Sequence, residues 1–368
     1  MDIVKNLNSF LTHESIVVRT YSACGIEKIL SMRDLDSKNL VITKEQISPL
    51  LVELLKQLNV LITESEGLNV YALMSLFRLI SVAKEDFMPY ASNFAEAIGT
   101  FVDKTINDQS TTSYSIYILF EIISFTIKWL ADTDPKVIKE YEDILMPKLN
   151  KILQENRTDV IIYVFQIYAA FVLNSSSPNL DSSYEVIAKS VLEDPSNTDM
   201  DMKYLVPGEI RLLCAILYKY PDFYSPYKEH LFGLFEKVLN KLSLEEDAMN
   251  LLACISETFP LNSISDELVD ATKKVFQRMF LYKNQTRLKR IPDVFLKSVY
   301  VFMSRFILCH GVESLVNLIH SFQDGILINF LEKEGLWIGR ISKTDFYRRY
   351  VWVAFTILAT EWNDLRLT

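Results

Sequence analysis

The sequence predicts an all-α fold in which antiparallel helix pairs stack side by side into an α-α superhelix. Glycine is scarce, with nine in 368 residues, against an average share of ~7%. Because sheets, dinucleotide-binding turns and phosphate loops need glycine, this scarcity disfavours most α/β enzymes. The second observation is a helical spacing of apolar residues, and the third is an alternation between two kinds of helix.

Residues 44–63 and 135–155 are predicted to be amphipathic helices of the first kind. In each, apolar residues recur at helical spacing on one face while charged residues occupy the other. Thr43 and Gln46 match a capping box at the start of the first helix, and Pro135 suits the first turn of the second. We expect one face of each helix to be buried and the other to face water.

Helices of the second kind are apolar almost all round and are expected to be buried on both sides. They cover residues 68–83, 112–130, 158–173 and 209–219, and a shorter helix is expected at 184–192. Repeat units are expected to begin near Ser15, Gly67, Ser110, Thr158, Pro207, Glu245 and Thr286. These intervals of about 40–50 residues are typical of HEAT or armadillo-like helix pairs. The prediction is therefore a single HEAT-repeat solenoid over residues 1–368, with about six to eight pairs that bury their apolar faces against one another.

Composition and charge narrow the possible partners and compartments. The net charge of −9 disfavours nucleic-acid binding, which needs clustered Lys and Arg, and suits basic protein partners. The apolar stretches 160–173 and 350–360 are too short or interrupted to span a membrane and are predicted to be core helices. Residues 1–15 lack the apolar region of a signal peptide. The four scattered cysteines are predicted to be reduced, buried thiols, so the expected compartments are cytosol or nucleus.

No catalytic, cofactor or metal motif is apparent, and the sequence predicts a protein that is not an enzyme. None of the four histidines has a partner at metal-ligand spacing. Cys309 and His310 are adjacent, so on a helix they point in different directions, and they are predicted to end a helix before Gly311. The many Phe and Tyr residues are expected to lie mainly in the core.

One cluster of basic residues is a candidate site for partner binding. Lys283, Arg287, Lys289 and Arg290 lie together between two predicted helices. A loop with this charge in an acidic protein can attract an acidic surface. The alternative is a solvated loop whose cations lie near the C-terminus of a helix at 264–282, where the helix dipole favours them.

Several segments in order resemble the CAS family of exportins, in the importin-β superfamily. Residues 13–34 read HESIVVRTYSACGIEKILSMRD, which is similar to a characteristic segment of that family. The likeness continues at residues 159–173, 209–220, 281–311, 325–343 and 349–361. In the last of these segments, Ala354 stands where the family motif has glycine, and Ile357 where it has lysine.

The resemblance implies a binding protein that returns importin-α from the nucleus. Such exportins are HEAT superhelices that bind importin-α cooperatively with RanGTP, pass the nuclear pore and release cargo in the cytoplasm. The expected localisation is therefore shuttling between nucleus and cytoplasm, and at the nuclear envelope, with pore proteins as further partners and no nucleic acid or membrane insertion. The alternative is a HEAT scaffold of another assembly, such as a phosphatase or coatomer-like subunit.

The resemblance lies with the carboxy-terminal half of the longer family chain, so the sequence is expected to be a fragment of a longer array. The first helix then is expected to expose its apolar residues, where further repeats would stack. These residues are Ile3, Val4, Leu7, Phe10 and Leu11.

Overall fold

The regular structure of the chain is helical. The computed structural model describes residues 2–108, 110–155, 157–193, 199–285, 290–335 and 347–362. Within these ranges every regular element is a helix, apart from one isolated bridge between Arg33 and Leu40. The all-α prediction is confirmed. The chain divides into two compact units, Met1–Ser176 (unit 1) and Ser177–Thr368 (unit 2); a single solenoid domain stays a prediction.

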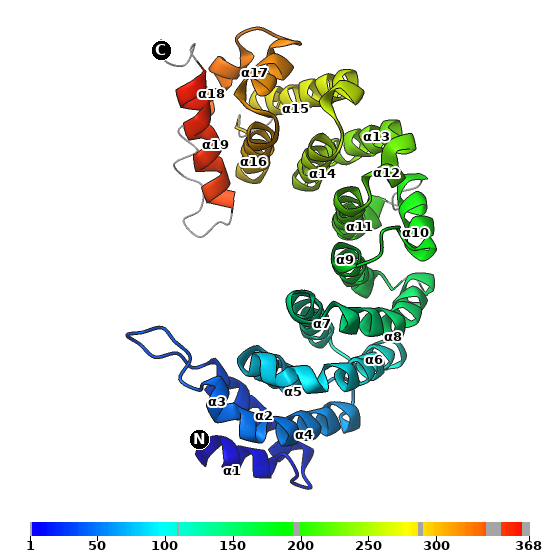
Figure 1. Cartoon of the computed structure of the whole chain (residues 1–368), viewed down its shortest axis with the longest axis vertical. Coiled ribbons are helices and arrows are strands. Elements are labelled where there is room, and N and C mark those ends of the chain that lie inside the picture. Colours follow the sequence, from blue (N-terminus) through cyan, green and yellow to red (C-terminus); the bar gives the residue numbers. More distant parts are fainter. Residues whose placement is uncertain are drawn as a thin grey trace. The chain divides into compact units, whose positions relative to one another are not determined.

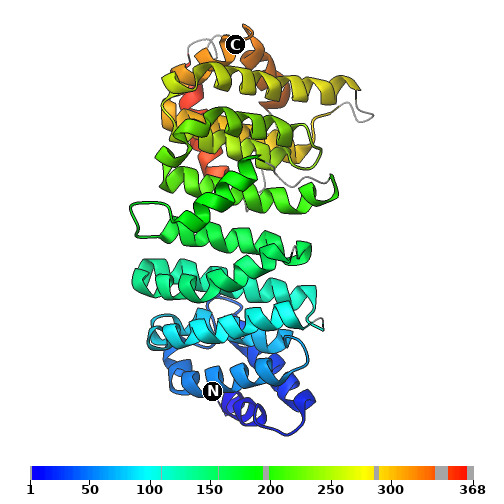
Figure 2. The ribbon, with the colours of Figure 1, turned by 90° about the vertical axis from the view of Figure 1, so that its right-hand side faces the viewer.

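Unit 1 is built from two layers of helices (Figures 1 and 2). The first layer consists of α2 (Ile16–Ser31), α5 (Val70–Ala83), α7 (Ser113–Thr133) and α9 (Thr158–Asn174), each in contact with the next. The second layer consists of α4 (Leu51–Glu64), α6 (Ala91–Asn107) and α8 (Pro135–Gln154). The short helices are α1 (Asp2–Phe10) and α3 (Lys44–Ile47), with 3₁₀ turns at Ser48–Leu50 and Lys84–Tyr90.

The two predicted kinds of helix form these two layers. In α8, Tyr141, Leu145 and Leu149 are fully buried, whereas the side chain of Lys139 is mostly exposed. In α7, buried residues occur on more than one side of the helix because α5, α8 and α9 all contact it. The two kinds of helix that alternate in the sequence therefore correspond to second-layer helices with one solvent-exposed face and first-layer helices packed between neighbouring helices.

The prediction of one continuous helix at 44–63 is wrong. The structure has α3, a 3₁₀ turn over Ser48–Leu50 and then α4. Pro49 lacks the N–H that would continue the α-helical hydrogen bonds, and its ring clashes with the preceding turn. The chain therefore forms a 3₁₀ turn there before the next α-helix begins. The predicted capping interaction does form, because the Gln46 side chain accepts a hydrogen bond from the Thr43 N–H at 3.0 Å.

The expectation for the first helix is wrong for two of its five apolar residues. Val4 and Leu11 are buried because α1 packs against α2 and α4. Leu7 is half-buried beside Gly25. Ile3 and Phe10 are exposed as expected, at 65% and 49%.

Unit 2 also has two layers. The first consists of α11 (Asp199–Lys219), α14 (Glu245–Thr258), α16 (Asp293–His310) and α19 (Tyr347–Glu361), and the second of α10 (Ser182–Glu193), α13 (Lys228–Leu239), α15 (Ser265–Gln285) and α17 (Val312–His320). Shorter helices are α12 (Pro221–Tyr224) and α18 (Ile326–Glu334). The expected start near Pro207 is wrong, because α11 begins at Asp199 and runs through this proline. Burial of Leu205 and Val206 just before it offsets the lost backbone hydrogen bond.

Among the described residues, α7 is the one helix that is long and apolar enough to cross a membrane. Half of the residues in its most apolar 18-residue stretch are buried inside the structure. Fully buried residues such as Leu119, Ile123 and Ile127 pack within unit 1, which is the environment of a core helix.

Candidate protein-binding surfaces

The predicted basic cluster is only partly described. Arg287 and Lys289 lie outside the described residues. The Lys283 ammonium is paired with Glu334 of α18, and Arg290 lies 3.5 Å from Asp293 at the start of α16. Two of the four cations therefore already have carboxylate partners within unit 2. Partner binding by this cluster stays a prediction.

The structure reveals a row of exposed tyrosines that the sequence did not. Tyr21 of α2 is 75% exposed, Tyr71 of α5 45%, and Tyr114 and Tyr117 of α7 54% and 40%. Tyr163 of α9 is half-buried. Each lies in the first half of its first-layer helix, whereas the aromatic residues had been expected mainly in the core.

Contacts between neighbouring helices set the relative levels of these tyrosines. The hydrogen bonds that fix the register run from Asn69 to Thr20 (2.8 Å), from Ser115 to the Leu68 carbonyl (2.9 Å) and from Gln166 to Ser124 (3.0 Å). The first of these sets the start of α5 level with Tyr21, and the second sets the start of α7 level with the start of α5. Tyr114 stacks on Tyr117 at 6.3 Å between ring centroids, and Tyr117 lies 6.2 Å from Tyr163. The tyrosines therefore occur at similar levels on four neighbouring helices, with direct ring contacts from Tyr114 through Tyr117 to Tyr163.

The loops between helices hold this register. The Gly67 N–H, in the loop before α5, donates to Asp108, directly after α6 in the loop that leads to α7, at 2.9 Å. Gly67 has a φ of 64°, and a Cβ atom there would lie 2.9 Å from the Ser110 carbonyl oxygen. Only glycine fits so close to that backbone in this conformation.

A second row, of cations, runs parallel to the tyrosines. Lys28 follows Tyr21 by two helical turns on the same face of α2, and Arg78 follows Tyr71 in the same way on α5. Both cations lie beside Glu27, at 3.2 Å and 3.6 Å. Lys128 of α7 is exposed and level with them, because Phe77 and Phe125 touch with ring centroids 5.3 Å apart. Residues Tyr21, Tyr71, Tyr114, Tyr117, Tyr163, Lys28, Arg78 and Lys128 are called the tyrosine–cation face below.

The phenol hydroxyls of this face are available to a partner. In the described part of the chain, Tyr21, Tyr71, Tyr114 and Tyr117 make no hydrogen bond through their hydroxyl groups. Burial raises the pKa of the Tyr163 phenol, and nearby Tyr117 and Glu121 raise it further. Each of these side chains offers a partner an apolar ring with one polar end.

Unit 2 holds a polar cluster between α11, α14 and α16. Arg305 contacts both carboxylate oxygens of Glu257 at 2.6 Å and also donates to the Tyr218 hydroxyl. That hydroxyl donates to Glu257 at 2.5 Å. Every charged group in the cluster has a partner in the cluster, so it acts as a brace between three helices.

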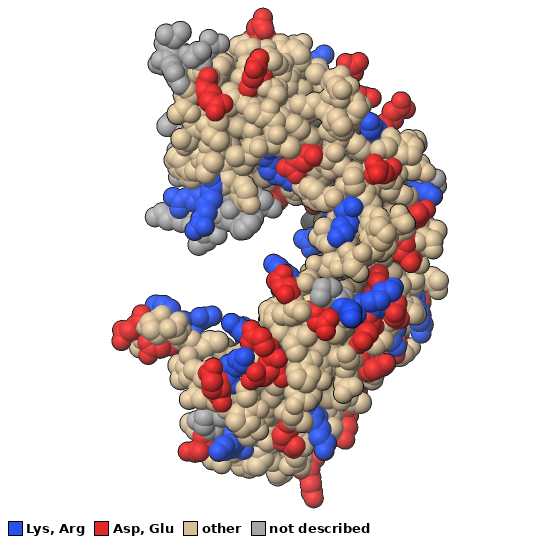
Figure 3. Space-filling view, in the orientation of Figure 1, with Lys and Arg blue, Asp and Glu red and all other residues tan. Residues whose placement is uncertain are grey.

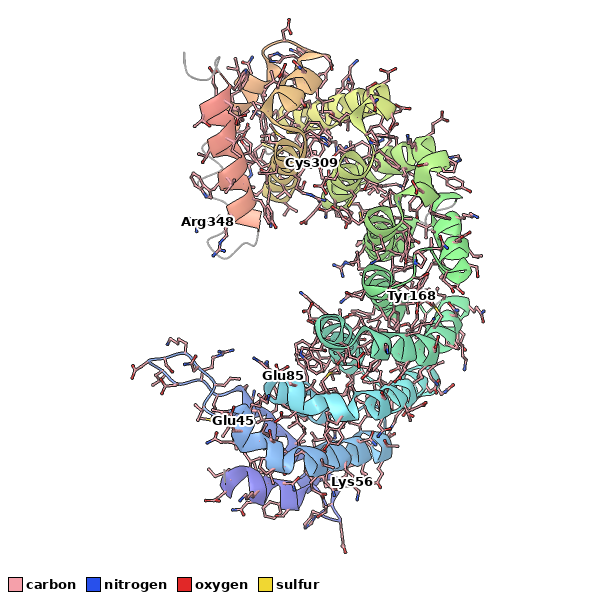
Figure 4. The ribbon with its side chains drawn as sticks, viewed as in Figure 1. Glu45, Lys56, Glu85, Tyr168, Cys309 and Arg348 are labelled. Atoms are coloured by element: carbon pink, nitrogen blue, oxygen red, sulfur yellow. The ribbon has the colours of Figure 1, made fainter. Side chains whose placement is uncertain are left out.

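The thiols near this brace are free. The Cys214 thiol shares a hydrogen bond with Cys254, which holds the pKa of Cys254 below its usual value while that of Cys214 is raised. The prediction of buried thiols is correct for Cys254, holds in part for the half-buried Cys24 and Cys214, and is wrong for Cys309, which is exposed near the end of α16 (Figure 4). His310 points away from it and contacts the Ser256 carbonyl at 2.7 Å, as expected for adjacent residues at a helix end. In the described residues, no three His, Cys, Asp or Glu side chains gather as a metal ion needs.

Asp247 of α14 gives a testable pH dependence. Burial raises the pKa of this carboxyl to about 6; Glu246 adds to the rise and Arg211 opposes it. Because the folded state binds the proton more tightly than the unfolded state, stability falls as pH rises from about 4 to about 6. We expect Asp247→Asn to raise the free energy of unfolding by about 1–2 kcal/mol at pH 7.5, after allowance for partial exposure, and by little at pH 4.5. Urea denaturation at both pH values measures this; an equal change at both, or the same gain from the exposed Asp222→Asn, would contradict it.

Comparison with known proteins assigns the chain to a family. Residues 27–366 match the sequence model described as "CAS/CSE protein, C-terminus". The chain belongs to the CAS/CSE family. The resemblance drawn from the sequence segments is therefore confirmed.

Relatives within the CAS/CSE family carry export-related names. Exportin-2 of Drosophila melanogaster is 24% identical over 360 residues, which cover 96% of this chain and 36% of that protein. The importin-alpha re-exporter of Schizosaccharomyces pombe is 26% identical over 273 residues, which cover 72% of this chain and 28% of that protein. This chain thus spans about a third of the length of these relatives.

A solved structure shares the fold. It is described as the exportin Cse1 in its cargo-free, cytoplasmic state, and it superposes with a TM-score of 0.71 at 20% sequence identity. The match covers 96% of this chain and 36% of Cse1. The predicted HEAT-like helical fold is confirmed, and the names of the relatives, exportin-2 and importin-alpha re-exporter, agree with the prediction of a protein that is not an enzyme.

The segments that carried the resemblance lie mainly on first-layer helices. They fall on α2, α9, α11, α16 and α19, apart from the segment at 325–343, which falls on α18; residues 286–289 and 336–343 lie outside the described residues. Ala354, which stands in place of the family glycine, is fully buried on α19, the helix that packs on α16.

Proposed function

We propose that this chain forms part of a nuclear export receptor for importin-α, which binds it cooperatively with RanGTP and carries it to the cytoplasm. The observation that supports the proposal is the family match over residues 27–366. The S. pombe relative is named an importin-alpha re-exporter. Importin-α and RanGTP are then the partners, together with pore proteins, and the receptor shuttles between nucleus and cytoplasm.

A stack of helix pairs suits cooperative binding on physical grounds. Each pair contacts mainly its neighbours, as α2, α5, α7 and α9 do, so many small interfaces can adjust together. Two partners that favour the same arrangement each raise the affinity of the other, and the effect is reciprocal. A coupling of about 5–150-fold is typical of such linkage.

Binding of fluorescently labelled importin-α to the full-length receptor that contains this chain tests the proposal. We expect RanGTP, held in the GTP state by a non-hydrolysable analogue, to lower the Kd for importin-α at least about fivefold, and RanGDP to leave it unchanged. Absence of importin-α binding by that receptor, both with and without RanGTP, would exclude the proposal. Binding that is equal in RanGTP and RanGDP would favour a scaffold role instead.

A further inference from the structure

We propose that the tyrosine–cation face of unit 1 binds an extended acidic segment of a partner protein that carries an apolar side chain at about every third position. The proposal rests on the geometry of this face and not on the identity of the exported cargo. Neither the family match nor the names of the relatives assign a function to these residues.

The spacing of the tyrosines sets the conformation of the segment. Packed helices lie 8–10 Å apart, so a path across α2, α5, α7 and α9 is roughly 27 Å long. An extended chain in the polyproline II conformation rises about 3.1 Å per residue with three residues per turn, so about nine residues cover the path and every third side chain points toward a new helix.

The rings supply the apolar part of the interaction. Tyr21 is the most exposed member, and Tyr71, Tyr114 and Tyr117 are each exposed by 40% or more. Val17, 58% exposed on α2 one turn before Tyr21, enlarges the apolar surface. Aromatic rings lose little conformational entropy on binding, which makes tyrosine an effective contact residue.

The charges exposed beside the rings are positive. The Lys28 side chain is 71% exposed and that of Arg78 45%, whereas the Glu27 carboxylate between them is 5% exposed. Glu121 of α7 is half-buried, and Asp132 lies one turn beyond Lys128 at the end of its helix. Asp159 of α9 is paired with Arg157 at 3.0 Å. Figure 3 shows both signs of charge spread over the visible surface. On this face, three cations lie about two to three helical turns beyond the rings, with Asp132 as an exposed carboxylate at its edge, so the face favours carboxylates.

Single-stranded nucleic acid is the other polymer that binds tyrosines flanked by cations. Three cations give few phosphate contacts, and the chain has a net charge of −9 that repels a polyanion. An acidic peptide carries fewer charges per length and gains more from apolar side chains, so the face favours protein. Binding of an acidic peptide and of a single-stranded oligonucleotide can be compared directly.

Fluorescence anisotropy with a fluorescein-labelled peptide tests the proposal. The probe repeats Glu-Asp-Leu three times, and the comparison probes repeat Glu-Asp-Ser or Lys-Lys-Leu three times or are a nine-nucleotide oligo-uridine. We expect the full chain to bind the first peptide with a Kd of about 10–100 µM and each other probe at least about tenfold more weakly.

Two pairs of substitutions locate the site. Tyr21→Ser with Tyr71→Ser, and Lys28→Glu with Lys128→Glu, are each expected to weaken binding at least about tenfold. Tyr21→Phe with Tyr71→Phe keeps the rings and is expected to retain binding within about threefold. Two matched controls are expected to leave the Kd unchanged. Phe280→Ser removes an exposed ring on α15, and Lys56→Glu reverses an exposed cation on α4 in the second layer (Figure 4).

Each outcome either supports or overturns the proposed peptide binding. Failure of the unaltered chain to bind the Glu-Asp-Leu peptide, tighter binding of oligo-uridine, or equal losses in the control variants would overturn the proposal. Circular dichroism melting curves identify any variant that fails to fold, and the exposed positions make such failure easy to separate from loss of contact. Importin-α is absent from the experiment, so its result and that of the RanGTP experiment can differ independently.

Discussion

Replacing Arg305 by methionine is expected to lower the free energy of unfolding by about 3 kcal/mol. The guanidinium makes two hydrogen bonds to Glu257 at 2.6 Å and one to Tyr218, and the side chains of Arg305 and Glu257 are only 20% and 19% exposed. Methionine fills most of the same volume but leaves the Glu257 carboxylate without its cation. The loss therefore comes mainly from an uncompensated buried charge that joins α14 to α16. Urea denaturation measures it.

Two further variants separate this explanation from a general loss of packing. Arg290→Met removes an exposed pair, with side chains 66% and 61% exposed, and is expected to cost less than about 0.5 kcal/mol. Arg305→Met combined with Glu257→Leu removes both charges and is expected to recover part of the stability. A double variant no more stable than Arg305→Met alone would contradict the explanation.

The helices and their two layers could be predicted because apolar periodicity directly reports which faces are buried. The break at Pro49 was missed, although proline itself was the signal, because the apolar stripe continues through it. The long start of α11 was missed for the opposite reason, since burial of Val206 outweighs the proline that follows it. At both prolines, local backbone preference and tertiary packing favour different structures, and the sequence alone does not show which effect is larger.

The tyrosine–cation face was harder to predict because it depends on register between repeats. Tyr117 and Phe120 both lie on the predicted apolar helix, yet Tyr117 is 40% exposed and Phe120 is 1% exposed. Their difference arises from the position of α9 beside α7. An available signal was the recurrence of tyrosine followed two turns later by a cation, as in Tyr21 with Lys28 and again in Tyr71 with Arg78. The basic cluster at 283–290, in contrast, was visible in composition, which does not reveal the carboxylates that pair with Lys283 and Arg290.

Replacing Tyr300 by alanine is expected to cost about 4 kcal/mol and to loosen α19. Tyr300 is fully buried on α16, and its ring centroid lies 5.3 Å from Phe330 of α18 and 5.3 Å from Phe355 of α19. Alanine removes the central ring of this trio and leaves a cavity that three helices cannot close together. Urea denaturation gives the free energy, and amide hydrogen exchange in residues 347–361 is expected to speed up more than in α14.

The control variants assign the effect to the ring. Tyr300→Phe keeps the ring and is expected to cost about 1 kcal/mol or less. Trp352→Ala removes a large side chain from α19 that is 46% exposed, so it is expected to cost less than Tyr300→Ala although it deletes more atoms. If Trp352→Ala were the more costly of the two, α19 would be held by its exposed face. Equal exchange in α14 and α19 of the Tyr300→Ala variant would instead mean that unit 2 unfolds as one piece and that the aromatic trio does not hold the last helix by itself.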